Sequence, residues 1–315
     1  MDTTCNGKAV SGFPNSVVFL PDFHGYAKSI VDFLIFSSLF VGISGMGMIY
    51  ISSFLQGLEP APVALVIMLL VPFSVYNMNR KTDEEEDSVN HPGRYLFTKR
   101  YEQPLAHCAL VAYVLAAVIA ASFGWGAVIV TLVPLIAGIF YSMPVLPKAF
   151  GYRRLKEIPI MKNLVVGSSW SIILVLLPCM IASVPITLQT CLCLLFFFTY
   201  AFIASSLPDM RDREGDALAG VITIPVMVGV ERTKKVLGAL NWITACVVII
   251  LGVSTMIPTI ALLLYAGAHC YTQYCITSFG MAGGNDFLCD ILSDGQFLII
   301  GSIVFLLQTV IPYLV

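Results

Sequence analysis

Two acidic clusters contain the side chains of this sequence that are best suited to chemistry. The first is Asn79-Arg-Lys-Thr-Asp83-Glu-Glu-Glu-Asp87, which directly follows an apolar stretch. If that stretch continues as a helix, residues four apart lie about 6 Å apart along the axis and drift only about 40° around it. Asn79, Asp83 and Asp87 then form one stripe of oxygen ligands, which suits Mg²⁺ bridging to substrate phosphates. The alternative is a solvated acidic loop that only ends the helix.

The second cluster is Asp209-Met-Arg-Asp212-Arg-Glu-Gly-Asp216, and it follows another apolar stretch. Asp212 and Asp216 are again four apart, and Asp209 is one turn earlier. Carboxylates gathered at a membrane boundary repel one another unless cations lie between them. The two clusters together predict a pair of Mg²⁺ ions that carry a diphosphate.

A basic group lies between the two acidic clusters in the sequence: Lys148, Arg153, Arg154, Lys156 and Lys162. Arg offers a planar fork and Lys a point charge to phosphate oxygens, so this group predicts a diphosphate clamp. Arg94 and Lys99 can contribute from the other side. The alternative is that these residues only mark a cytoplasmic loop, as Lys and Arg do in membrane proteins.

Aromatic and histidine side chains near the clusters permit two interpretations each. Tyr141 ends an apolar stretch and can either anchor it at the membrane interface or direct its phenol at the diphosphate. Trp170 and Trp242 can line a prenyl pocket or stabilise a carbocation through the ring face, although plain packing is the simpler role. No two histidines have helical metal-ligand spacing, so no histidine is assigned as a ligand.

The composition predicts that most of the chain lies in a membrane. Of its 315 residues, 58% are hydrophobic and 11% are charged, whereas a soluble domain has roughly 25% charged residues. Strand-like alternation is absent, and several stretches reach the roughly 20 apolar residues that a spanning helix needs. We predict an all-α, multi-span transmembrane bundle of about nine helices. The expected spans are 29–54, 63–79, 104–123, 126–145, 161–183, 187–207, 236–255, 257–276 and 296–315.

The distribution of the 17 Lys and Arg residues orders these spans. All of them precede the first span or lie in or beside the connections from even-numbered to odd-numbered spans. The positive-inside rule therefore predicts a cytoplasmic N-terminus, with both acidic clusters on the same side. The last such connection contains Asp286, Asp290 and Asp294, which can form a lid over the site or only a polar connection.

Residues 1–26 are expected to be an N-terminal cytoplasmic segment, and residues 27–315 a single membrane domain. The first 26 residues lack the basic start and apolar run of a signal peptide. The net charge of −2 does not suggest a basic surface, so no nucleic-acid partner is predicted.

With its motifs in this order, the sequence resembles the UbiA superfamily of intramembrane prenyltransferases. NRKTDEEED and the following SVNHPGR are similar to the first Asp-rich motif of that family, and DMRDREGDALAGVITIPVMVG is similar to the second. YSMPVLPK and RLKEIPIMKN are similar to its loop after the fourth helix. The sequence departs from the family at Arg80, where the family has Asp.

The resemblance implies a central cavity, Mg²⁺ as cofactor, and a prenyl diphosphate as donor. Its implied Mg²⁺–diphosphate ligands are Asn79, Asp83, Asp87, Asp209, Asp212 and Asp216. The residues expected to bind the diphosphate are Arg94, Lys148, Lys156 and Lys162. Those expected to act in catalysis are Asp83, Tyr141, Lys148 and Asp212.

The predicted reaction follows from charge. Mg²⁺ and basic residues stabilise the leaving diphosphate, so the prenyl C1–O bond can ionise, and an aromatic or lipid acceptor then traps the cation. One alternative is a membrane terpene cyclase of the same family, which needs no acceptor. Another is a cation-coupled transporter, but transporters place their ionisable residues near mid-bilayer rather than at one face.

Overall fold

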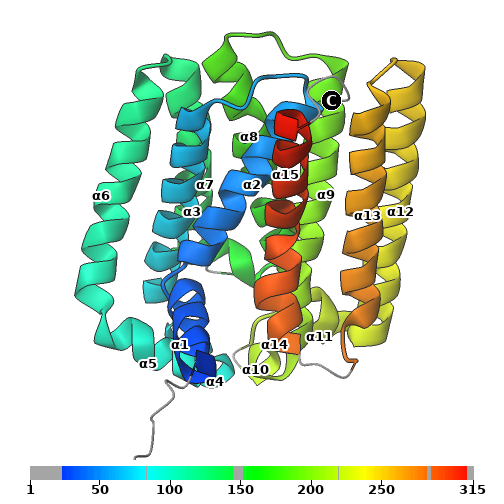
Figure 1. Cartoon of the computed structure of the whole chain (residues 1–315). Coiled ribbons are helices and arrows are strands. Elements are labelled where there is room, and N and C mark those ends of the chain that lie inside the picture. Colours follow the sequence, from blue (N-terminus) through cyan, green and yellow to red (C-terminus); the bar gives the residue numbers. More distant parts are fainter. Residues whose placement is uncertain are drawn as a thin grey trace, which may run out of the picture.

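The protein is a bundle of helices (Figure 1). The computed structural model describes residues 23–82, 84–144, 152, 154–218, 220–281 and 285–310, without the side chains of residues 23–28, 85 and 86. Every regular element within these residues is helical, which confirms the predicted all-α class. The long helices are α2 (Leu39–Leu55), α3 (Pro62–Thr82), α6 (Glu102–Ala121), α7 (Trp125–Ser142), α8 (Met161–Ala182), α9 (Leu188–Arg211), α12 (Val230–Ser254), α13 (Thr259–Ser278) and α15 (Asp294–Val310). The shorter elements are α1 (Phe23–Phe36), α4 (Glu84–Asn90), α5 (Pro92–Arg100), the 3₁₀ turn η2 (Leu155–Glu157), α10 (Arg213–Leu218), α11 (Ile224–Val228), α14 (Asn285–Phe287) and the π-helical turn η3 (Leu288–Ser293).

The predicted spans coincide with the long helices. Among the described residues, 7 helices are long and apolar enough to cross a membrane, and the bent pair of α1 and α2 makes up to 8. The predicted span 257–276 corresponds to α13, whose 20 residues include the polar His269 and Gln273 and which is not among those helices. When α13 is added to these helices and to the bent pair, the number of spans agrees with the predicted count of about nine. The protein is therefore an integral, multi-pass membrane protein.

The first predicted span, 29–54, is not one straight helix. α1 and α2 meet at an angle of 73°, and Ser38 has a left-handed backbone with φ 62. The last carbonyls of a helix have no partner within it, and the negative end of the helix dipole lies there. Arg80 of α3 donates hydrogen bonds to the carbonyls of Ile35, at 3.1 Å, and Phe36. The guanidinium of Arg80 therefore binds free carbonyls at the C-terminal end of α1 and stabilises the break there.

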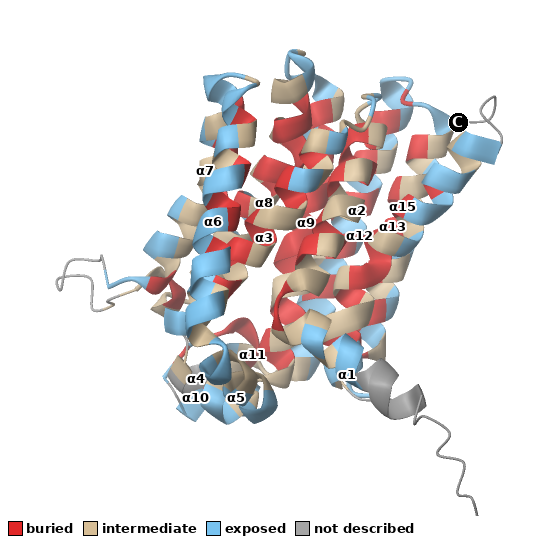
Figure 2. Ribbon diagram, turned by 60° about the vertical axis from the view of Figure 1, so that its left-hand side comes forward, coloured by how far each residue is buried: buried red, intermediate tan, exposed pale blue. Residues whose placement is uncertain are grey.

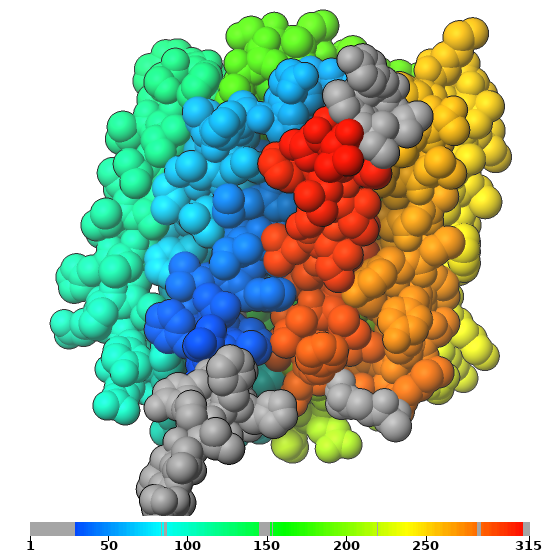
Figure 3. Space-filling model, in the orientation of Figure 1, coloured from blue at the N-terminus to red at the C-terminus, as the bar shows by residue number. Residues whose placement is uncertain are grey.

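Glycines bring α2 very close to its neighbours. At Gly47 a Cβ atom would lie 2.6 Å from the carbonyl oxygen of Phe297 on α15, so no side chain fits there. At Gly45 the equivalent distance to the carbonyl oxygen of Met68 on α3 is 2.7 Å. Small residues of this kind let transmembrane helices pack backbone to backbone. Figure 3 shows the resulting contact, with α2 in blue against α15 in red and orange.

Burial shows which faces of the helices meet and which face outward. Buried residues lie on the facing sides of the helices, and exposed ones on the outside (Figure 2). The fully buried large side chains include Phe196, Phe197, Tyr265 and Phe297. The outward face of α6 carries large exposed apolar side chains, among them Leu110, Val114 and Val118. In a soluble protein such a face would be a liability, whereas lipid covers it here.

The short helices gather at one end of the bundle. α4, α5, α10, α11 and α14 lie together at the lower end in Figure 1, away from the marked C-terminal end. They belong to the connections that were predicted to share one side of the membrane. The structure therefore confirms that these connections share an end, and we propose that this end is cytoplasmic, as the Lys and Arg distribution predicts.

The orientation can be tested by labelling with a membrane-impermeant maleimide in a background without native cysteines. Lys99→Cys in α5 and Lys235→Cys near the start of α12 are expected to react only after the cytoplasmic face is exposed. Ser122→Cys, at the C-terminal end of α6, is the control and should react from the other side. Labelling of Lys99→Cys and Lys235→Cys from opposite faces would overturn the topology.

Candidate active site

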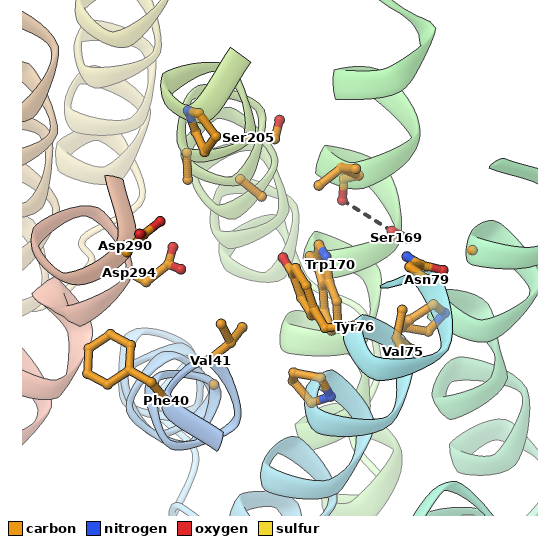
Figure 4. Close-up of a pocket in the computed structure, with 18 of the residues that line it drawn as sticks. Phe40, Val41, Val75, Tyr76, Asn79, Ser169, Trp170, Ser205, Asp290 and Asp294 are labelled. Carbon is orange, nitrogen blue, oxygen red and sulfur yellow. Dashed lines mark hydrogen bonds between the residues drawn. The ribbon is translucent and has the colours of Figure 1, made fainter. Parts of the chain in front are cut away.

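A cavity of about 330 Å³ lies inside the bundle near the end that carries the short helices. Its wall is formed by residues of α2, α3, α7, α8, α9 and α15, together with α4, α5 and η3. The carboxylate, amide and guanidinium groups that line it come from the helix ends beside the short helices. Much of its apolar lining lies further along the long helices, at residues such as Met48, Met68 and Leu174. Figure 4 shows Asp290 and Asp294 on one side and Asn79 on the other. The cavity therefore has the two-part character that a charged head and an apolar tail require.

Asn79 lies in the last turn of α3 and lines the cavity. It packs against α7 at Gly138, where a Cβ atom would lie 3.3 Å from Oδ1 of Asn79. Thr82 donates a hydrogen bond to the carbonyl of Asn79 at 2.6 Å.

The described part of the first acidic cluster lies in two helical segments, α3 up to Thr82 and α4 from Glu84. Asp83, between them, lies outside the described residues, so the predicted continuous helix stays a prediction at this position. Asp87 of α4 lines the cavity and accepts a 2.6 Å hydrogen bond from Arg94 of α5, which lines the cavity as well. Asn79 and Asp87 therefore lie at the same cavity, and the pair of Asp87 with Arg94 joins α4 to α5 there.

Asp212 caps the C-terminal end of α9 and lines the cavity. Its Oδ1 accepts a 2.9 Å hydrogen bond from Nε of Arg211, and its Oδ2 lies 3.2 Å from Nε2 of His91. Burial alone would raise the pKa of Asp212, but hydrogen bonds from His91 and Arg211, and their charge, lower it to about 2. Asp212 is therefore an anion at neutral pH.

The last acidic segment is part of the site rather than a loop. Asp286, Asp290 and Asp294 follow one another along α14, η3 and the start of α15, so the last helical segment begins well before residue 296. Asp290 and Asp294 line the cavity. Asp290 and Asp286 pair with Nη1 of Arg211 at 3.0 and 3.2 Å. π-helical turns such as η3 often occur at functional sites.

Aromatic rings form part of the apolar wall. Tyr76 and Trp170 both line the cavity and stack with their ring centres 5.9 Å apart and their planes at 14°. Tyr200 and Phe40 line it from α9 and α2. Tyr141, at the end of α7, lines the cavity too. Trp242 is 46% exposed on α12 and is not among the lining residues.

Four of the residues expected to bind metal or diphosphate are described but do not line the cavity: Asp209, Asp216, Lys156 and Lys162. Asp209 is 1% exposed and accepts hydrogen bonds from Lys162 at 2.5 Å and Asn163 at 2.9 Å. This pairing joins α9 to α8. Lys156 is buried in η2, and Asp216 is buried in α10. Lys148 lies outside the described residues.

Sequence reasoning left Asp290 and Asp294 open, either as a lid over the site or as only a polar connection, and the structure places both at the cavity. Their four-residue spacing is the same as in the two acidic clusters. Sequence reasoning gave no role in the site to Arg80 and Arg211, which line the cavity as well. No spacing rule identifies Arg211, because its role depends on which segments meet it in space.

The donor set fits a hard divalent cation that is held partly by substrate. Among the described residues, no three His, Cys, Asp or Glu side chains are arranged to hold a metal ion by themselves. Mg²⁺ is commonly held by one or two carboxylates plus substrate phosphates. Asp87 and Asp212 supply carboxylates, and Asn79 supplies an amide oxygen, all in one cavity.

A protein-family model decides which family this architecture represents. The model of the UbiA prenyltransferase family matches residues 36–282. The chain belongs to the UbiA prenyltransferase family. It is therefore an intramembrane prenyltransferase, and the transporter hypothesis is set aside. The match includes both acidic clusters and ends before α14, η3 and α15.

Solved structures of UbiA homologues share this fold. A UbiA homologue from Archaeoglobus fulgidus bound to GPP and Mg²⁺ has a TM-score of 0.64 and 18% identity, over 87% of this chain and 99% of that chain. A UbiA homologue from Aeropyrum pernix K1 has a TM-score of 0.61 and 12% identity, over 84% of this chain and 98% of that one. A digeranylgeranylglyceryl phosphate synthase structure has a TM-score of 0.55 and 17% identity, over 89% and 96%. No curated protein matches the sequence.

The contact between Gly138 and Asn79 gives a test of the cavity wall. Gly138→Val is expected to lower kcat/KM about tenfold or more, because the added methyl groups displace Asn79 from the cavity. Gly267→Val in α13 is the matched control, since no atom lies within 4 Å of a Cβ atom there. Equal activity of the two variants, measured as diphosphate release, would show that Asn79 has no part in the reaction.

Proposed function

We propose that this protein transfers a prenyl group from a prenyl diphosphate to an aromatic or lipid acceptor, with Mg²⁺ as cofactor. The observation that carries the proposal is the two-part cavity. Charged groups of α3, α4, α5, α9, η3 and α15 lie at one end of it, and much of its apolar and aromatic lining lies further along the helices. A prenyl diphosphate has this same division between a charged head and an apolar tail. Homologues of this fold are bound to GPP or DMAPP together with Mg²⁺.

The acidic residues have proposed roles as ligands. Asn79, Asp87 and Asp212 would hold Mg²⁺, joined by Asp83 on the basis of its sequence position. When bound, Mg²⁺ supplies positive charge to the leaving diphosphate. Asp209 is left out of this set, because both of its carboxylate oxygens accept hydrogen bonds from Lys162 and Asn163. Asp216 belongs to the same acidic cluster as Asp212, but it is buried in α10, and we assign it no role in holding Mg²⁺.

Arg94 has the geometry of a diphosphate ligand. One of its nitrogens pairs with Asp87 at 2.6 Å, which fixes the guanidinium at the cavity. Its Nε is buried without a hydrogen-bond partner among the described residues. A buried donor without a partner is costly, and a phosphate oxygen would satisfy it. Lys148 and Lys156 are further proposed diphosphate contacts from the connection between α7 and α8.

The reaction breaks the bond between prenyl C1 and the diphosphate oxygen, and the electron pair leaves with the diphosphate. Arg94 stabilises the charge that develops on that oxygen. The stacked rings of Tyr76 and Trp170 lie along the apolar wall, where their π-faces can stabilise an allylic cation. The acceptor then adds to C1 and loses a proton. Tyr141 lines the cavity and is proposed to contact the reacting groups.

Incubation of the purified protein with geranylgeranyl diphosphate, Mg²⁺ and a panel of phenolic and glycerol-phosphate acceptors tests this function. Mass spectrometry is expected to find a prenylated acceptor together with released diphosphate. Chelation of divalent ions should abolish both products, and re-addition of Mg²⁺ should restore them. A cyclic hydrocarbon formed from the donor alone would instead indicate a terpene cyclase.

The proposed ligands are tested by substitution. Asp87→Asn and Asp212→Asn are each expected to lower kcat about 100-fold or more, because they act on the charge of the leaving group in the transition state. Glu214→Gln is the matched control: it removes a carboxylate two residues from Asp212, but the side chain is exposed, so activity should stay within about twofold. Similar losses in all three variants would favour a solvated acidic surface.

A further inference from the structure

Arg211 contacts carboxylates of two different acidic segments. It ends α9, its side chain is 11% exposed, and it lines the cavity. Nε lies 2.9 Å from Asp212, while Nη1 lies 3.0 Å from Asp290 and 3.2 Å from Asp286. One guanidinium thus joins the second acidic cluster to the segment that precedes α15.

This arrangement engages both oxygens of Asp212. Oδ1 accepts from Nε of Arg211, and Oδ2 lies 3.4 Å from Nη2 of Arg211 and 3.2 Å from His91. A divalent cation that binds Asp212 must share these oxygens with the guanidinium or displace it. The two cations also repel each other at this distance. Arg211 therefore opposes a metal ion at Asp212 for as long as no further anion is present.

The donor's diphosphate is such an anion, and Arg211 remains placed to meet it. Asp290 lines the cavity and binds Nη1, whereas Asp212 binds Nε and Nη2, so the contact with Asp290 can hold the guanidinium at the cavity when Asp212 turns to a metal ion. A guanidinium has five N–H donors in a fixed fork, and pairs of them match phosphate oxygens. An incoming diphosphate can thus replace Asp212 as the partner of Nε.

We propose that Arg211 competes with the divalent cation for Asp212 and binds the diphosphate of the donor, and that Asp290 is the positioning residue that keeps it there. The inference rests on the proposed function, because it assumes a metal–diphosphate donor. Its consequence is an order of affinities. The cation binds weakly by itself and strongly in the presence of diphosphate, because the diphosphate draws the guanidinium away from Asp212.

The alternative is a purely structural ion pair that ties α9 to η3. Removal of Arg211 would then lower the stability of the protein, and the affinities for the cation and for pyrophosphate would change in the same direction. The proposal instead requires two changes of opposite sign in the same variant, which a loss of stability does not produce.

The experiment measures Mn²⁺ binding by the electron paramagnetic resonance signal of the free ion, with and without inorganic pyrophosphate. Arg211→Gln is expected to bind Mn²⁺ alone severalfold more tightly than the wild type and to bind pyrophosphate, at saturating Mn²⁺, about tenfold more weakly. Arg211→Lys should recover part of the pyrophosphate affinity, since the charge is kept but the fork is lost. Arg232→Gln, an exposed residue at the start of α12, is the matched control and should behave as wild type.

The role of Asp290 is tested by a double-mutant cycle. Asp290→Asn alone should weaken pyrophosphate binding, whereas in the Arg211→Gln background it should have no further effect, because it acts through the guanidinium. Additive losses would show that Asp290 contacts the metal or the ligand directly. If Arg211→Gln does not fold, Arg211→Lys and Asp290→Asn carry the same test, each with weaker pyrophosphate binding expected.

The outcomes separate this inference from the function on which it rests. If the wild type itself does not bind pyrophosphate with Mn²⁺, the proposed function fails and the inference fails with it. If the wild type binds both and Arg211→Gln matches Arg232→Gln, only the inference is overturned. A loss of both affinities in Arg211→Gln would likewise reject competition at Asp212.

Discussion

Charge balance at the edge of the membrane is the constraint on which this site depends. The cavity is lined by Asp87, Asp212, Asp290 and Asp294, and carboxylates gathered in one cavity repel one another. The protein offsets this with arginines from the same segments, since Arg94 pairs with Asp87 and Arg211 with Asp212 and Asp290. The segments that carry these residues are held together by the same pairs that balance their charge. The same ion pairs therefore assemble the site and hold the helices together at this end of the bundle.

Much of the architecture was accessible from the sequence because membrane helices obey simple rules. Long apolar stretches predicted the spans. Connections that carry Lys and Arg alternate with connections that carry none, which predicted which connections lie at the same end of the bundle. Even the short boundary that was predicted between the spans 236–255 and 257–276 is present in the structure, where Met256 has φ 56 and Pro258 precedes α13. The spacing of Asn79, Asp87 and Asp212 also identified residues that the structure brings to one cavity.

Other features could not be predicted, because they depend on contacts between distant segments. The pairing of Asp209 with Lys162 sets that carboxylate apart from its neighbour Asp212, although both have the same helical spacing. Arg80 looked like a disturbance of the first motif, whereas its side chain binds the carbonyls that end α1. The stacking of Tyr76 on Trp170 likewise joins residues of α3 and α8 that no periodicity relates.

The backbone contact between Gly47 of α2 and Phe297 of α15 joins two helices that lie far apart in the sequence. Because α15 and the preceding turn also bring Asp290 and Asp294 to the cavity, its wall is incomplete until these segments have been made and inserted. Chains grow from the N-terminus, so both acidic clusters are made before the segments that complete the wall around them.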